Sequence, residues 1–342
     1  MTKRARDFGL ACGSLPVGRL NAITDVAGVR VGHFNLHRDN LLTGFTAIVP
    51  HEGDLFREKL RAGADVINGF GKSAGLVQLA ELGQIETPIL LGNTLSVGTG
   101  FNALVSRALA ANADIGRETG TVNPVVLECN DGFLSDIRAR ALTEEDAHRA
   151  IDAAASGPVA EGAVGAGSGM SAFGFKGGIG TASRQIELDG RGYTLGVLVL
   201  ANFGNAGDLV LPDGRRPSPP KAPPPTPERG SVIIVLATDI PLESRQLGRV
   251  ARRCGAGLAR LGAFWGHGSG DIAVAFSTAG RLAHHETADL LPMAMLNESR
   301  IDLPFRAAAD ATQEAVLNAM LAAPAVTGRD GNWRPSLADV LG

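Results

Sequence analysis

Residues 212–237 read PDGRRPSPPKAPPPTPERGSVIIVLA, and this stretch decides how the rest of the chain is organised. Eight of the 18 prolines lie between Pro212 and Pro227. Such a run cannot complete a helix or a strand ladder, so we expect it to be extended and exposed. An apolar run at 231–237, typical of a buried strand, follows after three residues. Composition alone favours an interdomain linker, but a loop that ends in Gly-Ser against a buried strand also suits a self-cleaving precursor.

The sequence on both sides of this loop predicts interleaved strands and helices. Short apolar runs bounded by turn residues predict buried strands at 87–92, 124–128, 194–201, 231–237 and 271–277. Helical spacing of apolar residues predicts helices at 101–111, 144–155, 242–261 and 305–321. Thr143 is the expected N-cap of the second helix. The fold class is therefore α/β or α+β.

The overall composition indicates a globular protein. Hydrophobic residues make up 44% of the chain and the formal net charge is −3. These values disfavour disorder and provide no long-range attraction to nucleic acid. No apolar run is long enough for a signal peptide or a membrane span, so we expect a cytoplasmic protein that binds no membrane. The length of 342 residues, at roughly 150 per domain, on its own favours two domains.

Several common site motifs are absent from the sequence. GFGKS at 69–73 lacks the earlier glycine of a phosphate loop, because Val66 occupies that position. H-E-x-x-H does not occur, and Ser269 does not lie in a G-x-S-x-G motif because His267 and Asp271 occupy the outer positions, so we expect no metal and no cofactor. His267, in the sequence GHGSGD, is either a site residue or part of a tight turn.

The three cysteines, Cys12, Cys129 and Cys254, are widely spaced and odd in number, which suits a reducing compartment. Cys129 has polar neighbours in the sequence, but buried packing explains it better than a nucleophilic role. A second unusual feature is the glycine-rich segment 165–180, GAGSGMSAFGFKGGIG, which includes Lys176. It is either a tightly packed turn or a loop that lines a cleft.

Polar residues at strand ends form the candidate catalytic group. Ser231 opens one predicted strand, Ser269 and Asp271 lead into another, and Asn202 closes a third. If the Gly230–Ser231 bond breaks, residue 231 carries both a hydroxyl and an α-amine that titrates near 7.7–8.0 and can accept the hydroxyl proton. Ser269 and Asp271 could orient this proton transfer, and Asn202 could donate to an oxyanion.

Seven segments, in order along the chain, resemble the DmpA-type aminopeptidases. This family of self-processing serine peptidases includes β-aminopeptidases and nylon-oligomer hydrolases. The segments are AITDVAGVRVGH (22–33), GNTLSVGTGFNALV (92–105), LECNDGFLSDI (127–137), GAVGAGSGMSAFGFKGGIGTASR (162–184), VLANFGN (199–205), GSVIIVLATDIPL (230–242) and GHGSGDIAVAFST (266–278). Together they extend the resemblance from one end of the chain to the other.

The resemblance implies a single domain with the four-layer αββα sandwich that is similar to N-terminal-nucleophile hydrolases. It further implies cleavage between Gly230 and Ser231 into fragments 1–230 and 231–342, with 212–229 as the exposed loop before the cut. Relatives form tetramers, which implies a homo-oligomer here. The division into two domains that length suggested is then replaced by one domain in two pieces.

The resemblance also implies roles for individual residues. Ser231 becomes the nucleophile that forms an acyl-enzyme, Ser269 and Asp271 assist it, and Asn202 supplies the oxyanion hole. Glu128 would bind the free ammonium group of the substrate. Asn130 is the second residue expected to contact the substrate. Relatives can carry glutamate where Asp271 stands, and a relative carries tyrosine where this chain has Asn130.

Three alternatives for these residues stay open. Glu128 could merely cap a turn, Asn205 could replace Asn202 as the donor, and Ser269 could be a turn serine.

The expected activity is removal of N-terminal residues from short peptides, amides or esters that bear a free amine. Acyl transfer from the same acyl-enzyme is one alternative. A binding protein that kept the fold without catalysis is another. The sequence does not specify a preference for L-, D- or β-amino acids.

Overall fold

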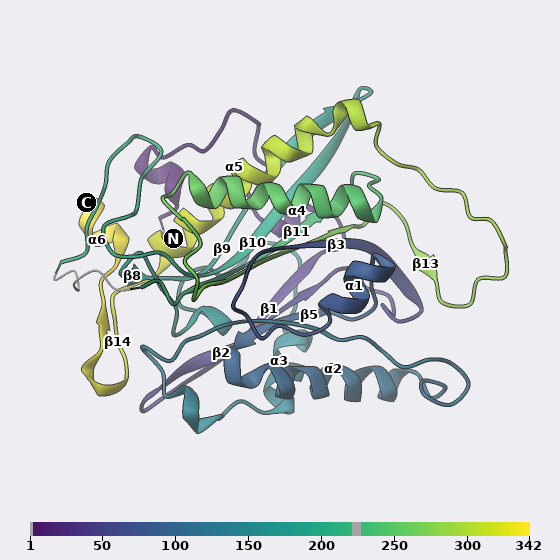
Figure 1. Cartoon of the computed structure of the whole chain (residues 1–342), viewed down its shortest axis with the longest axis horizontal. Helices are drawn as coiled ribbons and strands as arrows, with labels where there is room; N and C mark the ends of the chain where they lie inside the picture. The colour runs from purple at the N-terminus through teal and green to yellow at the C-terminus, as the bar shows by residue number, and fades with distance from the viewer. Residues whose placement is uncertain (1–2, 221–226) are drawn as a thin grey trace.

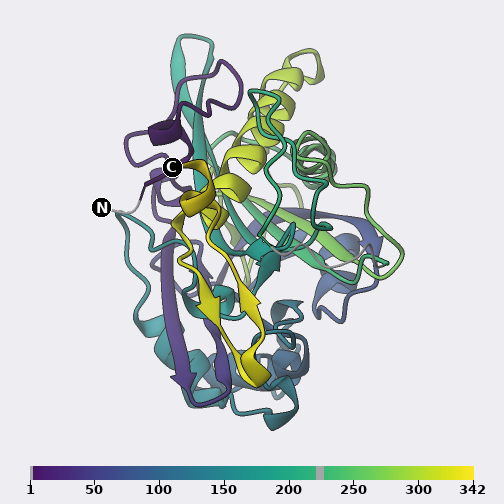
Figure 2. The same cartoon turned by 90° about the vertical axis from the view of Figure 1, so that its left-hand side faces the viewer.

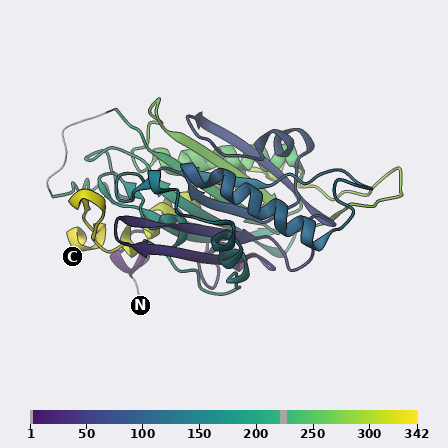
Figure 3. The same cartoon turned by 90° about the horizontal axis from the view of Figure 1, so that it is seen from below.

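A computed structural model describes residues 3–220 and 227–342, and its four layers are helices, sheet, sheet and helices (Figure 1). Helices α4 (Ser244–Ala259) and α5 (Asp302–Ala322) pack on the outer face of the larger sheet. Helices α2 (Val97–Ala111) and α3 (Glu144–Asp152) pack on the outer face of the smaller sheet, which Figure 3 shows from below. The αββα sandwich is thus confirmed.

Two sheets form the inner layers. The seven-stranded sheet has the order β13 (Leu282–Ala283), β3 (Glu58–Gly69), β12 (Gly270–Ser277), β11 (Ser231–Thr238), β10 (Arg191–Asn202) and β9 (Gly178–Leu188), with β4 (Gln84–Ile85) beside β3. The four-stranded sheet has the order β1 (Arg30–Arg38), β2 (Leu41–Val49), β5 (Ile89–Asn93) and β6 (Val125–Cys129). Strands from both sides of residue 230 share the larger sheet, so the chain does not divide into two domains there.

Strand β11 lies in the interior of the larger sheet, which explains its unbroken apolar sequence. It pairs antiparallel with β10 and parallel with β12. Val232, Ile234 and Leu236 pack toward α4 and α5, whereas Ile233 and Val235 face the smaller sheet. Because both faces of the strand are covered, apolar residues are required at every position.

The strands and helices expected from the sequence are found within a few residues of their predicted ends. The five predicted strands are β5, β6, β10, β11 and β12, and the four predicted helices are α2, α3, α4 and α5. Thr143 caps α3 as expected, since its hydroxyl accepts the Asp146 N–H at 3.3 Å. Among the described residues, no helix is long and apolar enough to cross a membrane.

Smaller elements join these layers. They are α1 (Leu76–Leu82), β7 (Ser171–Ala172), β8 (Phe175–Lys176), β14 (Val326–Thr327), β15 (Trp333–Arg334) and α6 (Leu337–Leu341). Figure 2 shows the hairpin of β14 and β15 and the helix α6 at one end of the molecule. The backbone there is tied to the sandwich, because the Lys176 N–H donates to the Pro335 carbonyl at 2.9 Å.

The glycine-rich segment 165–180 is a tightly packed turn, and none of its residues lines the main cleft. A Cβ at Gly180 would lie 2.0 Å from the Ala315 carbonyl of α5, so glycine allows strand β9 to meet that helix. The Lys176 side chain is fully buried, and its Nζ donates to the carbonyls of Gly167 at 2.8 Å and Gly177 at 2.9 Å. The alternative of a cleft-lining loop is therefore wrong.

The proline-rich loop is exposed over most of its described length. Between residues 212 and 220 the side chains are exposed or half-buried apart from Pro219, and residues 221–226 lie outside the described part. Glu228 differs from this pattern because it is 6% exposed, although it belongs to the segment 212–229 that was expected to be exposed.

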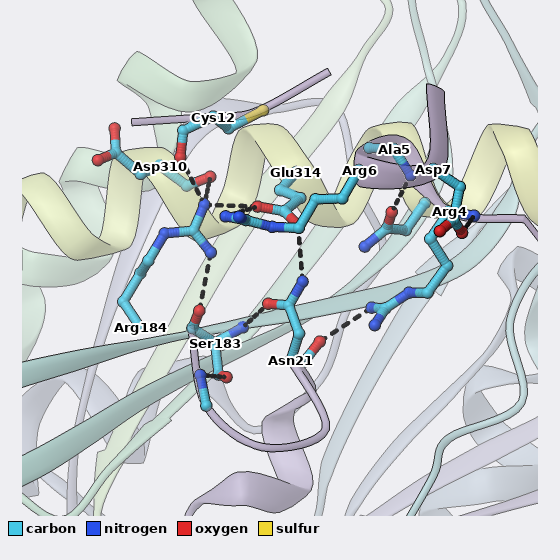
Figure 4. Close-up of polar contacts among 12 residues, drawn as sticks. Arg4, Ala5, Arg6, Asp7, Cys12, Asn21, Ser183, Arg184, Asp310 and Glu314 are labelled. Atoms are coloured by element: carbon cyan, nitrogen blue, oxygen red, sulfur yellow. Dashed lines mark hydrogen bonds and ion pairs between the residues drawn. The ribbon is translucent and has the colours of Figure 1, made fainter. Parts of the chain in front are cut away.

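A buried polar cluster fastens the N-terminal segment and β9 to α5 (Figure 4). The Arg184 guanidinium lies 2.7 Å from the Glu314 carboxylate, and both side chains are fully buried. Arg6 lies 2.8 Å from the same carboxylate, and the Asn21 amide donates to it at 2.6 Å. Glu314 follows residue 230 in the chain whereas its three partners precede it, so this cluster ties the two expected fragments together.

Candidate active site

A cleft of about 640 Å³ opens at the edge where β10 ends and β11 begins. It contains four of the site residues expected from the sequence: Glu128, Asn130, Gly230 and Ser231. Other side chains in its wall are Phe70, Lys72, Thr94, Asn205, Glu228, Phe264 and His267. The phosphate-loop-like segment around Phe70 thus contributes to a cleft wall, although its sequence does not match that motif.

Ser231 is the first residue of β11 and lies between two paired strands. It is opposite Asn202 of β10 and beside Gly270 of β12. The side chain is 4% exposed, and among the described residues its Oγ has no hydrogen-bond partner. Leaving a buried hydroxyl without a partner is unfavourable, so such a group is typical of a functional site.

The Asn202 side chain is held in place directly opposite Ser231. Its Oδ1 accepts the Ser171 N–H at 2.9 Å, and its Nδ2 donates to the Asn130 carbonyl at 3.1 Å. Directly paired residues of antiparallel strands have Cβ atoms about 4.5–5.5 Å apart on one face. Asn205 lines the cleft together with Ser231, whereas Asn202 does not line it and is near Ser231 through the pairing of β10 with β11.

Glu128 reaches the cleft from β6 of the other sheet. It is 3% exposed, and its carboxylate accepts the Lys72 N–H at 2.8 Å and the Thr94 hydroxyl. These hydrogen bonds hold the loop around Lys72, which is the role expected if Glu128 caps a turn. The same carboxylate nevertheless lines the cleft together with Ser231, where it can meet a positively charged group.

Ser269 and Asp271 form a buried pair at the start of β12. The Ser269 hydroxyl donates to Asp271 Oδ1 at 2.7 Å, and the Asp271 side chain is 1% exposed. Burial raises the pKa of Asp271 to about 6, and the nearby Glu228 charge adds to this, while the Ser269 hydrogen bond and the Val232 backbone oppose the rise.

The Asp271 carboxylate does not bond directly to the Ser231 hydroxyl. Asp271 is in register with Val232, so its side chain projects toward α4 and α5, whereas Ser231 projects toward the other sheet. Among the described residues, neither Ser269 nor Asp271 donates to or accepts from Ser231 Oγ. The pair is therefore next to the Ser231 backbone rather than its side chain.

Cys129 and Asn130 follow Glu128 at the end of β6. The Cys129 thiol is fully buried beside Ser231 without a well-aligned hydrogen bond to it, and donates to the Leu200 carbonyl at 3.6 Å. Burial, together with the Glu128 charge, raises the pKa of Cys129 well above its usual value, which disfavours the thiolate. The Asn130 Oδ1 accepts the Gly132 N–H at 2.8 Å, so this side chain closes its own turn at the cleft wall.

The peptide bond expected to break lies at the same edge. The Gly230 carbonyl accepts the Gly270 N–H at 3.3 Å. A Cβ at residue 230 would lie 2.6 Å from the Asn202 carbonyl oxygen, so a larger residue does not fit there. Glu228 lies two residues before Gly230, and its side chain is buried. It was not predicted as a site residue from the sequence. Its position just before Arg-Gly-Ser was the signal that could have pointed to it.

No metal-binding group is found in the described part of the chain. Within residues 3–220 and 227–342, no three His, Cys, Asp or Glu side chains come together in a way that could hold a metal ion. The site as described consists of protein groups: a hydroxyl, carboxylates, amides and backbone N–H donors.

Comparisons with known proteins match nearly the whole chain. Residues 21–334 match the sequence model of peptidase family S58. The chain is 41% identical to the beta-peptidyl aminopeptidase BapA of Sphingosinicella microcystinivorans, over 96% of this chain and 88% of that protein.

Two solved structures have the same fold along nearly their whole length. The PH0078 protein of Pyrococcus horikoshii OT3 has a TM-score of 0.93 and 47% identity, over 99% of this chain and 98% of that one. The L-aminopeptidase D-Ala-esterase/amidase of Ochrobactrum anthropi has a TM-score of 0.89 and 38% identity, over 98% and 95%. The latter is described as a prototype serine aminopeptidase and a variant of the Ntn hydrolase fold.

Proposed function

Because this chain belongs to peptidase family S58 and is an aminopeptidase, we propose that Ser231 is its nucleophile and that the chain cuts itself before this residue. The observation that carries the proposal is the Ser231 hydroxyl, which is buried and without a partner among the described residues at the mouth of the cleft. Cleavage of the Gly230–Ser231 bond would give this residue a free α-amine, which is the base that its hydroxyl lacks in the uncut chain.

The other groups at this edge have complementary roles in the proposed mechanism. Ser231 Oγ attacks the substrate carbonyl while the α-amine takes its proton, and water later resolves the acyl-enzyme. Asn202 donates to the oxyanion, and Ser269 with Asp271 stabilises the protonated amine through the backbone side of Ser231. Glu128 binds the ammonium group of the substrate, which restricts cleavage to N-terminal residues.

The substrates we propose are short peptides, amides and esters with a free amine. The 41% identity to a β-peptidyl aminopeptidase supports including β-aminoacyl amides among them. An extra methylene moves the ammonium group away from the scissile carbonyl. The experiment compares kcat/KM for α- and β-aminoacyl p-nitroanilides with the same side chain. The better substrate shows which separation of ammonium group and carbonyl matches the distance between Glu128 and Ser231.

Ser231→Ala tests the proposal. Wild-type protein should give two fragments on denaturing electrophoresis, and the smaller should begin Ser-Val-Ile-Ile on N-terminal sequencing. The alanine variant should stay intact and lose kcat/KM by at least about 10⁴-fold, as expected for loss of a nucleophile. Ser231→Cys, which keeps a nucleophile, should be cut in part. An intact wild-type protein, or an active alanine variant, would contradict the assignment.

We also propose that the protein forms a homo-oligomer and works in a reducing, cytoplasmic environment. The segment around β13 reaches out from the body in Figures 1 and 3. It carries four exposed large apolar side chains, Leu290, Leu291, Met293 and Met295, which favours contact with another copy of the chain. The three cysteines are free and buried, which suits reducing conditions. Light scattering coupled to size exclusion measures the assembly.

A further inference from the structure

Glu228 is buried beside the bond that is proposed to break, and it links the two strands that flank β11. Its Oε1 accepts the Gly204 N–H at 2.7 Å, just beyond the end of β10. Its Oε2 accepts the Gly266 N–H at 2.8 Å, in the loop that leads into β12. A carboxylate that accepts two backbone N–H groups is strongly held, because charged acceptors make stronger hydrogen bonds than neutral ones.

The backbone of Glu228 and Gly230 lies close to two neighbouring loops, although Pro227 and Arg229 are exposed. A Cβ at Gly266 would lie 2.7 Å from Glu228 Cβ, and one at Gly268 would lie 2.7 Å from the Glu228 carbonyl oxygen. A Cβ at Gly230 would lie 2.6 Å from the Asn202 carbonyl oxygen. Glycine at these three positions lets the segment 228–230 lie between the two loops in one defined position.

This arrangement separates the scissile bond from the exposed proline-rich loop that precedes it. Residues 212–220 are mostly exposed, whereas the Gly230 carbonyl accepts the Gly270 N–H at 3.3 Å. Attack by Ser231 on its own preceding carbonyl needs the two groups held in a reactive geometry, and such positioning can contribute several kcal/mol to a rate. Glu228, whose carboxylate is held by the Gly204 and Gly266 N–H groups between the loop and the bond, supplies this positioning.

We propose that Glu228 is the positioning residue for self-cleavage: its carboxylate clamps segment 228–230 to the ends of β10 and β12. The Gly230 carbonyl thereby keeps its hydrogen bond from the Gly270 N–H, and the bond that precedes Ser231 stays in one position. This inference rests on the self-cleavage proposed above. In that step the Oγ–C bond forms as the Gly230–Ser231 C–N bond breaks, and the hydroxyl proton passes to the departing nitrogen. Water then hydrolyses the ester to a Gly230 carboxylate and a free Ser231 hydroxyl.

Glu228 also acts on Asp271 through its charge, which provides a second readout. The groups that influence Asp271 are the Ser269 hydroxyl, the Val232 backbone and the Glu228 carboxylate, and the buried Cys129 thiol lies near it. The negative charge of Glu228 adds to burial in raising the pKa of Asp271. Neutralising Glu228 should therefore shift the acidic limb of a pH profile to lower pH, an effect that loss of packing alone does not produce.

The experiment follows the appearance of the two fragments by denaturing electrophoresis after a short pulse of synthesis, in full-length protein between pH 5 and 9. Glu228→Gln cannot accept both N–H groups and should be cut at least 10-fold more slowly. Once cut, it should show the acidic limb of kcat/KM, which we assign to Asp271, at lower pH than wild type. Glu228→Asp keeps the charge but is one methylene shorter. Glu228→Asp should also be cut slowly, and the acidic limb of its kcat/KM profile should stay at the wild-type pH. If Glu228→Gln fails to fold, the cleavage rate of Glu228→Asp tests the proposal.

Asp213→Asn is the matched control. Asp213 lies in the same proline-rich loop, and its carboxylate accepts the Arg215 N–H at 3.0 Å without joining two strands. This variant should be cut within about twofold of the wild-type rate. Glu228 variants that are cut as fast as wild type would overturn the role of Glu228, whereas uncut wild-type protein would overturn the self-cleavage itself.

Discussion

Two buried carboxylates, Glu314 in the cluster on α5 and Asp271 at the cleft edge, have opposite surroundings. Glu314 is fully buried, and Arg6, Arg184 and Asn21 bond to its two oxygens. Asp271 is 1% exposed and accepts one hydrogen bond from Ser269, while its Oδ2 has no partner among the described side chains. The first carboxylate has cationic partners that compensate its burial, and the second does not.

The pKa values of the two groups move in opposite directions. Burial alone would raise the pKa of Glu314, but the Arg6 hydrogen bond and the Arg184 charge outweigh it and lower the value. Burial raises the pKa of Asp271 to about 6. Ionised Glu314 thus stabilises the fold at neutral pH, and this contribution is lost as the pH falls through its lowered pKa. The comparison separates a carboxylate that is ionised and holds the fold at neutral pH from a carboxylate whose raised pKa lies near 6 at the edge of the cleft.

Arg184→Met should have the largest effect on stability of the changes that test this comparison. It leaves the Glu314 charge buried with Arg6 as its remaining cationic partner, and removing one member of a buried ion pair costs about 3 kcal/mol or more. Urea unfolding measures the loss, and kcat/KM of the folded protein should stay within about twofold. Arg6→Met removes a partly exposed partner and should cost about 1 kcal/mol or less. Equal losses in the two variants would contradict the special role of Arg184.

Asp271→Asn should have the opposite effect to Arg184→Met: kcat/KM should fall, whereas the free energy of unfolding at pH 7 should not decrease. The amide still accepts from Ser269, but it removes the charge near the Ser231 backbone, so kcat/KM should fall roughly 100-fold. Because the folded-state pKa is raised, the stability contribution of Asp271 is present below pH about 4 and is lost as the pH rises through about 6.

The stability difference between wild type and this variant should therefore change between pH 4 and 7 by up to about 2–3 kcal/mol. The acidic limb near pH 6 in wild-type kcat/KM should also disappear in the variant. Chemical denaturation and pH profiles of both proteins measure these effects. A variant less stable than wild type at pH 7 would place Asp271 with Glu314 as a structural group.

Cys129→Ala should have the smallest effect. The thiol is buried beside Ser231, and its pKa is raised by burial, so its loss removes packing and no reactive group. We expect unfolding to become easier by about 1 kcal/mol, with self-cleavage and kcat/KM within about threefold of wild type. A 100-fold loss of activity would restore Cys129 as a candidate nucleophile.

The sequence predicted those strands and helices whose apolar pattern can be recognised within a single short segment. The runs at 231–237 and 271–277 are apolar because both faces of β11 and β12 are covered, and such runs stand out in any window. Strands β1, β2, β3 and β9 were missed, since charged residues, glycine, threonine or serine interrupt their apolar patterns. Their conformation depends on pairing with distant strands, and single-segment propensity does not carry that information.

The residues of the candidate site, like the strands, were predicted only in part. The resemblance singled out Ser231 and Glu128, and the fold brings them into one cleft from two different sheets. The sequence did not reveal Glu228, because its two partners are backbone N–H groups of Gly204 and Gly266, 24 and 38 residues away. It also did not show that Asp271 and Ser231 project to opposite faces, which follows from strand register.

The larger sheet has a consequence for the lifetime of the processed protein. Strands β3, β9 and β10 precede residue 230, whereas β11, β12 and β13 follow it. An uncut chain can regain this sheet by a first-order process, independent of dilution. Two separate pieces must first meet, so their reassembly slows as they are diluted. Cleavage would thus make folding a one-time event, after which the rate of unfolding, rather than an equilibrium, governs how long the enzyme lasts.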